Sequence, residues 1–239
     1  MIMCSLSHPT IVKFIGYSLK DPKGNNQITI IMELYKKGSL RDIIQQETLC
    51  LADVAYDNTK KQIILIGISY ALRLLHRLRI IHRDLKPENV LLNDKLLPLL
   101  SDFGLSKFCQ SINQSVACGT PFYMADEIST KKYDFKVDVF AFGILMIEVI
   151  CGIPSNTDDF ITKFENYQLK DELKKLIKRC ISKDPKERPT FEEIFQKLSD
   201  VDDDNFCLDN IDKKLEPYEV TSEILKYLAE VGNSRLPTE

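Results

Sequence analysis

The sequence lacks the features that mark several large classes of protein. None of its seven cysteines stands in a CxxC pair, so neither a zinc knuckle nor a disulfide framework is indicated. Lysines and arginines are spread along a chain of formal net charge -3, without the basic stripe of a nucleic-acid-binding protein. No apolar run reaches the length of about eighteen residues that spans a bilayer, and the first residues lack the basic lead and apolar core of a signal peptide. We therefore expect no nucleic-acid partner, no membrane and a reducing, cytoplasmic location.

The composition supports one substantial folded domain. The chain has 239 residues, of which 44% are apolar, enough for a single core and a short appendage. Short strand-like segments come first and helical segments follow, so the expected fold class is α+β.

The strand-like segments form two predicted hairpins. β-Branched runs at 10–16 and 27–32 flank the turn-rich stretch 21–26. Two shorter apolar runs, at 90–92 and 96–100, are separated by an Asn-Asp turn.

Helical periodicity or capping predicts helices in the remaining chain. A short helix at 39–46 begins with a capping serine, and a long core-facing helix begins near 57–59. An almost wholly apolar helix at 138–151 is expected at the centre of the domain, stopped by Gly152. Two amphipathic helices are predicted at 170–181 and 190–198.

The C-terminal part has a different composition. The acidic residues between 200 and 204 indicate a solvated linker rather than a metal site. A last helix is predicted at 222–231, with one apolar stripe that could dock on the main domain or on a partner.

Two motifs carry chemistry. The segment His82-Arg83-Asp84-Leu85-Lys86-Pro87-Glu88-Asn89 is followed by Ser101-Asp102-Phe103-Gly104. They resemble, in order and spacing, the catalytic loop and the magnesium-binding segment of eukaryotic protein kinases. The alternative is a polar turn between a helix and a hairpin, but about ten specified positions coincide, which disfavours it. The resemblance implies a protein-kinase-like fold, mostly the α-helical large lobe with a remnant of the small-lobe β-sheet.

The resemblance also implies residue roles. Asp84 would orient the attacking hydroxyl of a protein substrate, and Lys86 would steady the transferred phosphoryl group. Asn89 and Asp102 would hold Mg²⁺, a hard cation that takes oxygen ligands, with ATP as the phosphate donor.

The adenine site is expected at a hinge between the lobes. Backbone groups of Glu33 and Tyr35, in the segment that starts at Met32, would face the base, with Leu91 packed beneath it. These residues could instead be plain core. The implied domains are 1–35 (small-lobe remnant and hinge), 36–199 (large lobe) and 200–239 (acidic linker and last helix).

Further segments resemble the family in the same order. The segment 119–125 resembles the substrate-facing end of the activation segment, and 138–143 resembles the start of the central helix. The segment 184–189 resembles a turn near the end of the lobe. The resemblance implies a buried ion pair between Glu127 and Arg188. Asp126 stands where the family usually has proline, which leaves that turn less preset.

The resemblance also implies which amino acids accept the phosphate and how activity is controlled, but only at the level of groups within the family. Lys86 with Thr120 is similar to the Ser/Thr-specific branch, and the segments 176–180 and 188–191 are similar to the tyrosine-kinase-like group. Arg83 beside the catalytic carboxylate suggests control by phosphorylation of the 103–117 loop, with Ser111 and Ser115 as candidate acceptors; an ordinary polar loop is the alternative.

The sequence lacks the small-lobe parts of a complete kinase. The nine glycines include no GxG pair, and no lysine strand or partner glutamate precedes His8. We therefore expect a fragment of a Ser/Thr kinase that lacks the Gly-rich loop and the ATP-anchoring lysine. The alternatives are a catalytically impaired kinase-like binding or scaffold module, and a lobe that is completed in trans for slow phosphotransfer.

Overall fold

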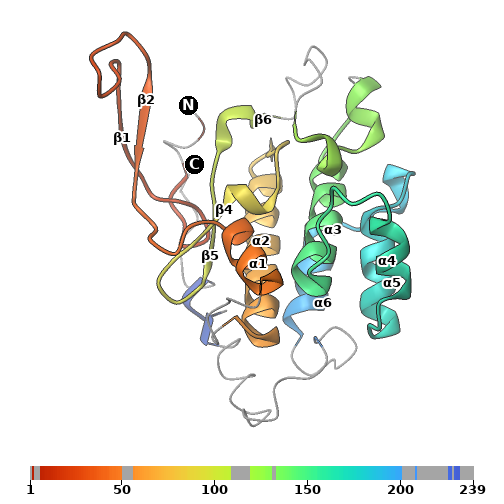
Figure 1. The fold of residues 1–239 in the computed structure, drawn as a ribbon. Helices are drawn as coiled ribbons and strands as arrows, with labels where there is room; N and C mark the ends of the chain where they lie inside the picture. The colour runs from red at the N-terminus through yellow and green to blue at the C-terminus, as the bar shows by residue number, and fades with distance from the viewer. Residues whose placement is uncertain are drawn as a thin grey trace.

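A body of helices with one projecting β-hairpin makes up the molecule (Figure 1). The computed structural model describes residues 2, 6–49, 56–108, 119–130, 133–200, 208, 226, 227 and 229–231, with only the backbone at 108. The strands within these ranges form three separate two-stranded antiparallel sheets. The predicted α+β fold, mostly helical with small sheets, is confirmed.

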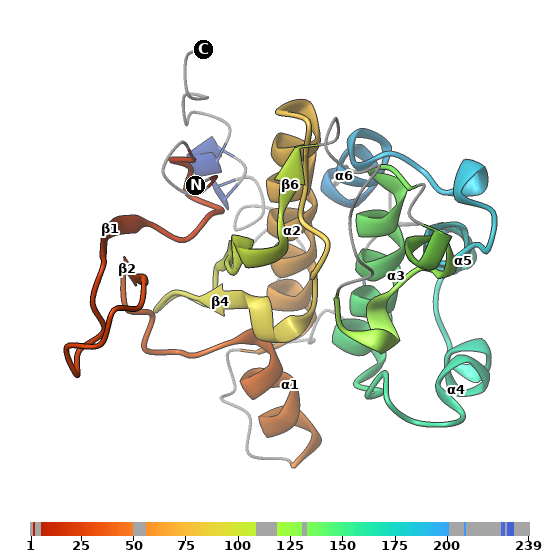
Figure 2. The ribbon, with the colours of Figure 1, turned by 90° about the horizontal axis from the view of Figure 1, so that it is seen from above.

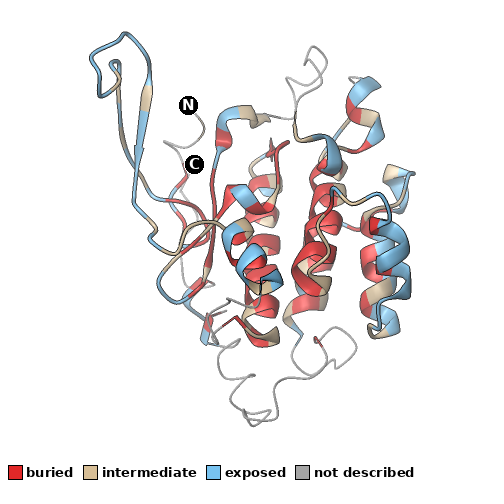
Figure 3. Ribbon diagram, viewed as in Figure 1, coloured by how far each residue is buried: buried red, intermediate tan, exposed pale blue. Residues whose placement is uncertain are grey.

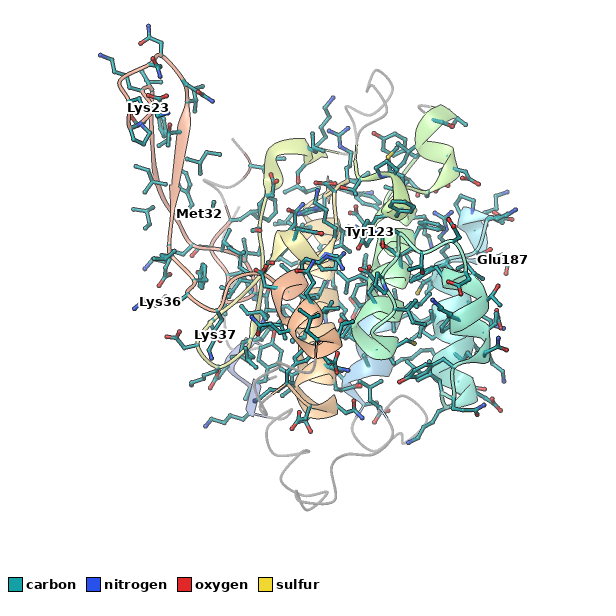
Figure 4. All side chains as sticks on the ribbon, in the orientation of Figure 1. Lys23, Met32, Lys36, Lys37, Tyr123 and Glu187 are labelled. Carbon is teal, nitrogen blue, oxygen red and sulfur yellow. The ribbon has the colours of Figure 1, made fainter. Side chains whose placement is uncertain are left out.

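The projecting hairpin consists of β1 (Phe14–Ser18) and β2 (Thr29–Met32). Its strands begin later than the predicted segments 10–16 and 27–32. Ile11 instead forms a parallel bridge with Leu100, which ties the start of the chain to the helical body. Figure 4 shows Lys23 at the tip of the hairpin, far from that body.

The first two helices begin at side-chain caps, and the sequence predicted the cap of the first. Ser39 and Asp42 form a reciprocal capping box at the start of α1 (Leu40–Thr48). Asp57 accepts a hydrogen bond from the Lys60 N–H at the start of α2 (Asn58–Arg77). Both predicted helices are confirmed.

The long α2 and α3 (Lys136–Cys151) form the centre of the body, and their side chains are buried almost all round (Figure 3). Gly152 ends α3 in the left-handed conformation, with φ of 64°. A Cβ at Gly143 would lie 2.6 Å from the Ile181 side chain, so glycine lets the helix that ends at Cys180 pack closely against α3.

The described part of the body also contains the shorter helices α4 (Phe160–Asn166), α5 (Asp171–Cys180) and α6 (Phe191–Ser199). α5 packs against α3, and α6 packs against α2 (Figure 2). The sequence predicted α5 and α6, whereas α4, which buries Phe160 and Phe164, was not predicted.

Two small sheets arrange the loops between α2 and α3. The predicted hairpin is confirmed as β4 (Val90–Leu92) and β5 (Pro98–Leu100). An unpredicted pair, β3 (Ile80–Ile81) with β6 (Lys107–Phe108), lies nearby. Because β3 precedes the segment 82–89 and β6 follows the segment 101–106, the two sheets bring these segments side by side.

The C-terminal residues that the structure describes pack on the domain. Tyr227 and Val231 are helical and join the main core together with Leu208. A Cβ at Gly67, in the middle of α2, would lie 2.1 Å from the Tyr227 hydroxyl oxygen, so glycine makes room for this tyrosine. The rest of the predicted helix 222–231 and the acidic stretch after Asp200 lie outside the described residues.

The hairpin contrasts with the body in its exposure. Large apolar side chains on and beside β1 and β2 are exposed to solvent (Figure 3): Ile15, Tyr17, Leu19, Ile28, Ile30, Ile31, Met32 and Leu34. No helix among the described residues is long and apolar enough to cross a bilayer.

Candidate active site

A buried carboxylate organises the loop that follows β3. Asp138, on α3, accepts hydrogen bonds from the backbone N–H groups of His82 and Arg83, both at 2.9 Å. His76, near the end of α2, donates to the same carboxylate at 2.9 Å. Burial raises the pKa of Asp138, but the bond from His76 and the other donors outweigh it and leave the pKa lowered. The ionised Asp138 thus fixes the backbone where the loop begins.

His82 links this loop to the segment after β5. Its Nδ1 accepts from the Asp84 N–H at 3.4 Å, so Nε2 carries the proton and donates to the Ser101 carbonyl at 2.9 Å. The ring also packs edge-on against Phe103, with centroids 5.3 Å apart. The two motif segments are therefore held together by a buried side chain.

Asp84 lies at the centre of a cluster of polar side chains. Its Oδ2 is 3.0 Å from Lys86 Nζ and accepts from Asn89 Nδ2 at 3.0 Å. Its Oδ1 accepts from Thr120 Oγ1 at 2.9 Å, and Thr120 in turn accepts from Lys86 at 2.8 Å. The structure thus brings together three sequence-predicted site residues and the threonine of the later segment.

The cluster keeps Asp84 ionised. Burial raises its pKa, but the hydrogen bonds from Lys86, Thr120 and Asn89 outweigh burial and lower it. A lowered pKa makes the carboxylate a hydrogen-bond acceptor throughout the neutral pH range.

The β4–β5 hairpin brings Asn89 next to Ser101, the residue before Asp102. The Asn89 carbonyl accepts from both the backbone N–H and the hydroxyl of Ser101, at 2.8 and 2.9 Å. Asp102 is the next residue, with φ of 54°, and its Oδ1 accepts from the Gly104 N–H at 3.1 Å. The Asp102 side chain is exposed, unlike that of Asn89.

The oxygen atoms of these two residues suit a hard cation. The Asn89 amide nitrogen donates to Asp84, which leaves its amide oxygen as an acceptor, and Asp102 offers an exposed carboxylate. Among the described residues, no group of three or more His, Cys, Asp or Glu could hold a metal ion without other ligands. A cation here would need further oxygens, such as those of a nucleotide phosphate.

The predicted hinge has two backbone groups available. The Glu33 N–H bonds to the Lys13 carbonyl and the Tyr35 carbonyl accepts from the Gly38 N–H, at 3.0 and 3.2 Å. Within the part of the chain that the structure describes, neither the Glu33 carbonyl nor the Tyr35 N–H makes a hydrogen bond.

Of the other predicted adenine contacts, Leu91 is half-buried and forms a bridge with Ser39, just after the hinge. Met32 is exposed at the base of the hairpin (Figure 4). The hinge therefore borders β4 on one side and solvent on the other.

The segment 119–130 is fixed at both ends. Gly119 has φ of 127°, and a Cβ there would lie 2.9 Å from the Arg83 carbonyl oxygen. At the other end, Glu127 forms a two-pronged ion pair with Arg188, at 2.5 and 3.1 Å. The predicted pair is confirmed, although Asp126 replaces the usual proline and is exposed.

Arg83 has φ of 69° and makes contacts of its own. Its guanidinium donates to the Leu105 carbonyl and, at 3.1 Å, to the Tyr133 hydroxyl. Ser111 and Ser115, the candidate phosphorylation sites, lie outside the described residues, so that prediction stays a prediction.

Sequence reasoning missed several residues that shape the site. Asp138 and His76 were assigned no role there, because they are 62 positions apart. A second network was also missed: Arg41 on α1 contacts Glu88, Tyr123 and Glu148. No local pattern signals such contacts, since each depends on how distant helices pack.

The fold and this site define a class of protein: a helical lobe in which the loop 82–89, which carries the Asp84 cluster, is held beside the segment 101–104. A family model of the protein kinase domain matches residues 1–198. The serine/threonine-protein kinase dst1 of Dictyostelium discoideum is 34% identical over 210 residues. A probable serine/threonine-protein kinase of the same organism is 32% identical over 226 residues. This chain belongs to the protein kinase family.

The match covers most of this chain but a small part of the relatives. The aligned residues are 81% of this chain and 27% of dst1, and 86% of this chain and 36% of the second relative. Both relatives are named serine/threonine kinases; the tyrosine-kinase-like grouping stays a prediction.

Proposed function

We propose that the chain is the large catalytic lobe of a serine/threonine protein kinase, which transfers the γ-phosphate of ATP to Ser or Thr hydroxyls of a protein substrate. One observation carries the proposal: the ionised carboxylate of Asp84 is held by Lys86, Thr120 and Asn89. A carboxylate positioned in this way can accept the hydrogen of a substrate hydroxyl and orient its oxygen toward the phosphate.

The neighbouring side chains take complementary roles in the proposal. The Lys86 ammonium lies close enough to Asp84 to balance negative charge on the transferred group. Asn89 and Asp102 would hold Mg²⁺ through their oxygens, and the bound cation would neutralise phosphate charge.

The hinge supplies the adenine site in this proposal. The Glu33 carbonyl and the Tyr35 N–H are an acceptor and a donor two residues apart, which suits the edge of an adenine base. Met32 and Leu91 provide apolar contact on its faces. The proposed domains are 1–35, the small-lobe remnant and hinge; 36–199, the large lobe; and 200–239, the acidic linker and last helix.

Acceptor choice rests on Lys86 and Thr120, which contact each other and Asp84. This contact is consistent with Ser and Thr acceptors. A cytoplasmic location is proposed from the cysteines: Cys151 and Cys180 are free thiols, and burial raises the pKa of each to about 12, so they are unreactive.

A second candidate function is a kinase-like binding module with little catalysis. The exposed apolar side chains of the β1–β2 hairpin favour it, because a lone two-stranded sheet is marginally stable in water. In the catalytic proposal these side chains are covered by further strands that complete the ATP site.

The test is phosphate transfer from Mg²⁺ and γ-labelled ATP to a generic protein substrate, followed by identification of the labelled amino acid. We expect label on Ser or Thr, and a loss of about 10²–10⁴-fold for Asp84→Asn. Asp94→Asn is the matched control, because Asp94 is an exposed aspartate on the β4–β5 turn. Equal activity of Asp84→Asn and the control contradicts the catalytic proposal. No transfer, with no nucleotide binding, favours the binding module.

A further inference from the structure

A second cavity, of about 280 Å³, lies where the end of α2, the start of α3 and the start of α6 meet. Among the residues that line it in the described structure, none belongs to the catalytic cluster or to the hinge. We call it the α2–α3–α6 cavity. Sites for drug-sized ligands usually measure about 300–1,000 Å³, so this cavity suits a smaller ligand of one or two rings.

Aromatic rings form one part of the lining. The centre of the His76 ring lies 4.8 Å from that of Phe135 and 5.0 Å from that of Phe191, and all three residues line the cavity. Phe191 and Val139 are almost fully buried, whereas His76 and Phe135 are half-buried. Aromatic rings favour neighbours at about 4.5–7 Å, edge-on or offset, so this group can accept the ring of a ligand.

Two arginines in the lining share one carboxylate. Glu192 lies 3.0 Å from Arg73 and 2.8 Å from Arg77. Arg73 is also held over the rings of Tyr70 and Phe195, whereas the side chain of Arg77 is 51% exposed. Arg77 therefore has donors within reach of a ligand.

A lysine adds a further positive charge. Lys136 Nζ donates to the carbonyl oxygens of Arg188 and Pro189, and in the described structure both of these partners are uncharged. Asp134 is the second carboxylate of the lining, and it is exposed.

The charges of the lining do not cancel. Arg73, Arg77 and Lys136 face two carboxylates, those of Asp134 and Glu192, which leaves one positive charge in excess among the described lining residues. Such an excess favours an anionic ligand and opposes a cationic one. Because the excess is a single charge, it matches a monoanion.

We propose that the α2–α3–α6 cavity binds a small aromatic carboxylate, with its ring against Phe135 and Phe191 and its carboxylate at Arg77. His76, which lines the cavity, also bonds Asp138 at 2.9 Å, so the ligand contacts a residue that supports the segment 82–89. The inference does not rest on the proposed kinase function.

The experiment measures the dissociation constant of indole-3-acetate for the purified 239-residue chain by ligand-detected NMR titration. Three analogues separate the contributions: acetate lacks the ring, indole-3-acetamide lacks the charge and tryptamine reverses it. Burial of the ring predicts that acetate binds at least about tenfold more weakly. The charge excess predicts that indole-3-acetamide binds about two- to fivefold more weakly, tryptamine more weakly still, and that added salt narrows the difference.

Two variants locate the site. Arg77→Gln should weaken indole-3-acetate about two- to fivefold and leave indole-3-acetamide unchanged. The matched control is Arg179→Gln, because Arg179 pairs with Glu193, the next residue of α6, outside the cavity. Phe135→Ala should weaken both indoles severalfold, whereas Phe122→Ala, at an exposed phenylalanine outside the cavity, should not. Circular dichroism checks that each variant is folded, and the arginine pair decides if Phe135→Ala is not.

The outcomes support or overturn the proposal as follows. Preference for the acid over the amide, reduced by Arg77→Gln and not by Arg179→Gln, supports it. Equal binding of acid and amide, tighter binding of tryptamine, no binding of indole-3-acetate, or cavity variants that behave like their controls overturn it. Binding of the acidic peptide acetyl-Asp-Trp-Asp-amide without binding of indole-3-acetate also overturns it and indicates a protein partner instead. Phosphate transfer is measured separately, so its loss or presence leaves this result unaffected.

Discussion

Removal of Glu127 tests the packing of the segment that ends beside the active site. Arg188 is only 2% exposed and donates to Glu127, to the Ser182 carbonyl at 2.8 Å and to the Lys136 carbonyl at 2.9 Å. Its guanidinium also lies 5.0 Å from the centre of the Phe140 ring. In Glu127→Ala the cation stays buried with backbone acceptors only.

Breaking a buried ion pair by removal of one partner costs about 3–5 kcal/mol. The two remaining carbonyl bonds of Arg188 favour the lower end, so we expect a loss of about 3 kcal/mol in the free energy of unfolding. In a domain of this size that loss lowers Tm by about 6–12 °C. Glu127→Gln, which keeps the shape and a hydrogen-bond acceptor, should lose less.

The assay is urea unfolding followed by circular dichroism, with the slope of free energy against urea checked for constancy. Glu172→Ala is the control, because the Glu172–Lys175 pair is exposed on both sides and is expected to contribute at most about 1 kcal/mol. A Glu127→Ala loss no larger than that of the control would refute the buried pair as the anchor of this segment.

Three further predictions follow from single contacts. Gly67→Ala should destabilise the protein by about 1–3 kcal/mol in urea unfolding, despite the higher helix propensity of alanine, because its Cβ would collide with Tyr227; a stabilised variant contradicts this packing. Burial lowers the pKa of His8 below its ordinary 6.5, so the unfolded chain binds more protons and stability should fall as the pH is lowered through 6.5. The stability of the His8→Asn variant should fall less over the same pH range, and an equal fall in stability rules His8 out as the cause. Lys86→Ala should lower the phosphate-transfer rate by about 10²–10³-fold, by analogy with loss of one transition-state donor, with little change in KM for ATP; a change in KM alone contradicts a role beside Asp84.

Local signals predicted most of the fold. Ser39 was recognised as a helix start because a capping side chain acts within its own turn, and the start of the second helix near 57–59 was found from its apolar periodicity. The apolar composition of 138–151 predicted a central helix, and α3 begins only two residues earlier. The short α4 and the β3–β6 pair were missed, because a few residues carry too little periodicity to indicate an element.

The chemical groups of the site were predicted, but the residues that position them were not. Asp84, Lys86 and Asn89 were found from the family resemblance of one loop, and the Glu127–Arg188 pair from the same resemblance. The bond from His76 to Asp138 joins α2 to α3, and nothing in either helix alone indicates it. Such contacts depend on the packing of distant segments rather than on local sequence.

In the proposed kinase function, Asn89 and Asp102 act with Asp84 on one metal-bound nucleotide. The most direct measurement is electron paramagnetic resonance of Mn²⁺, used in place of Mg²⁺, titrated with the chain in the presence and absence of an adenine nucleotide. We expect that nucleotide promotes Mn²⁺ binding and that Asn89→Ala and Asp102→Ala each weaken this binding at least severalfold, whereas Asp94→Ala does not. Mn²⁺ binding that is indifferent to nucleotide, or equal in all three variants, would contradict it.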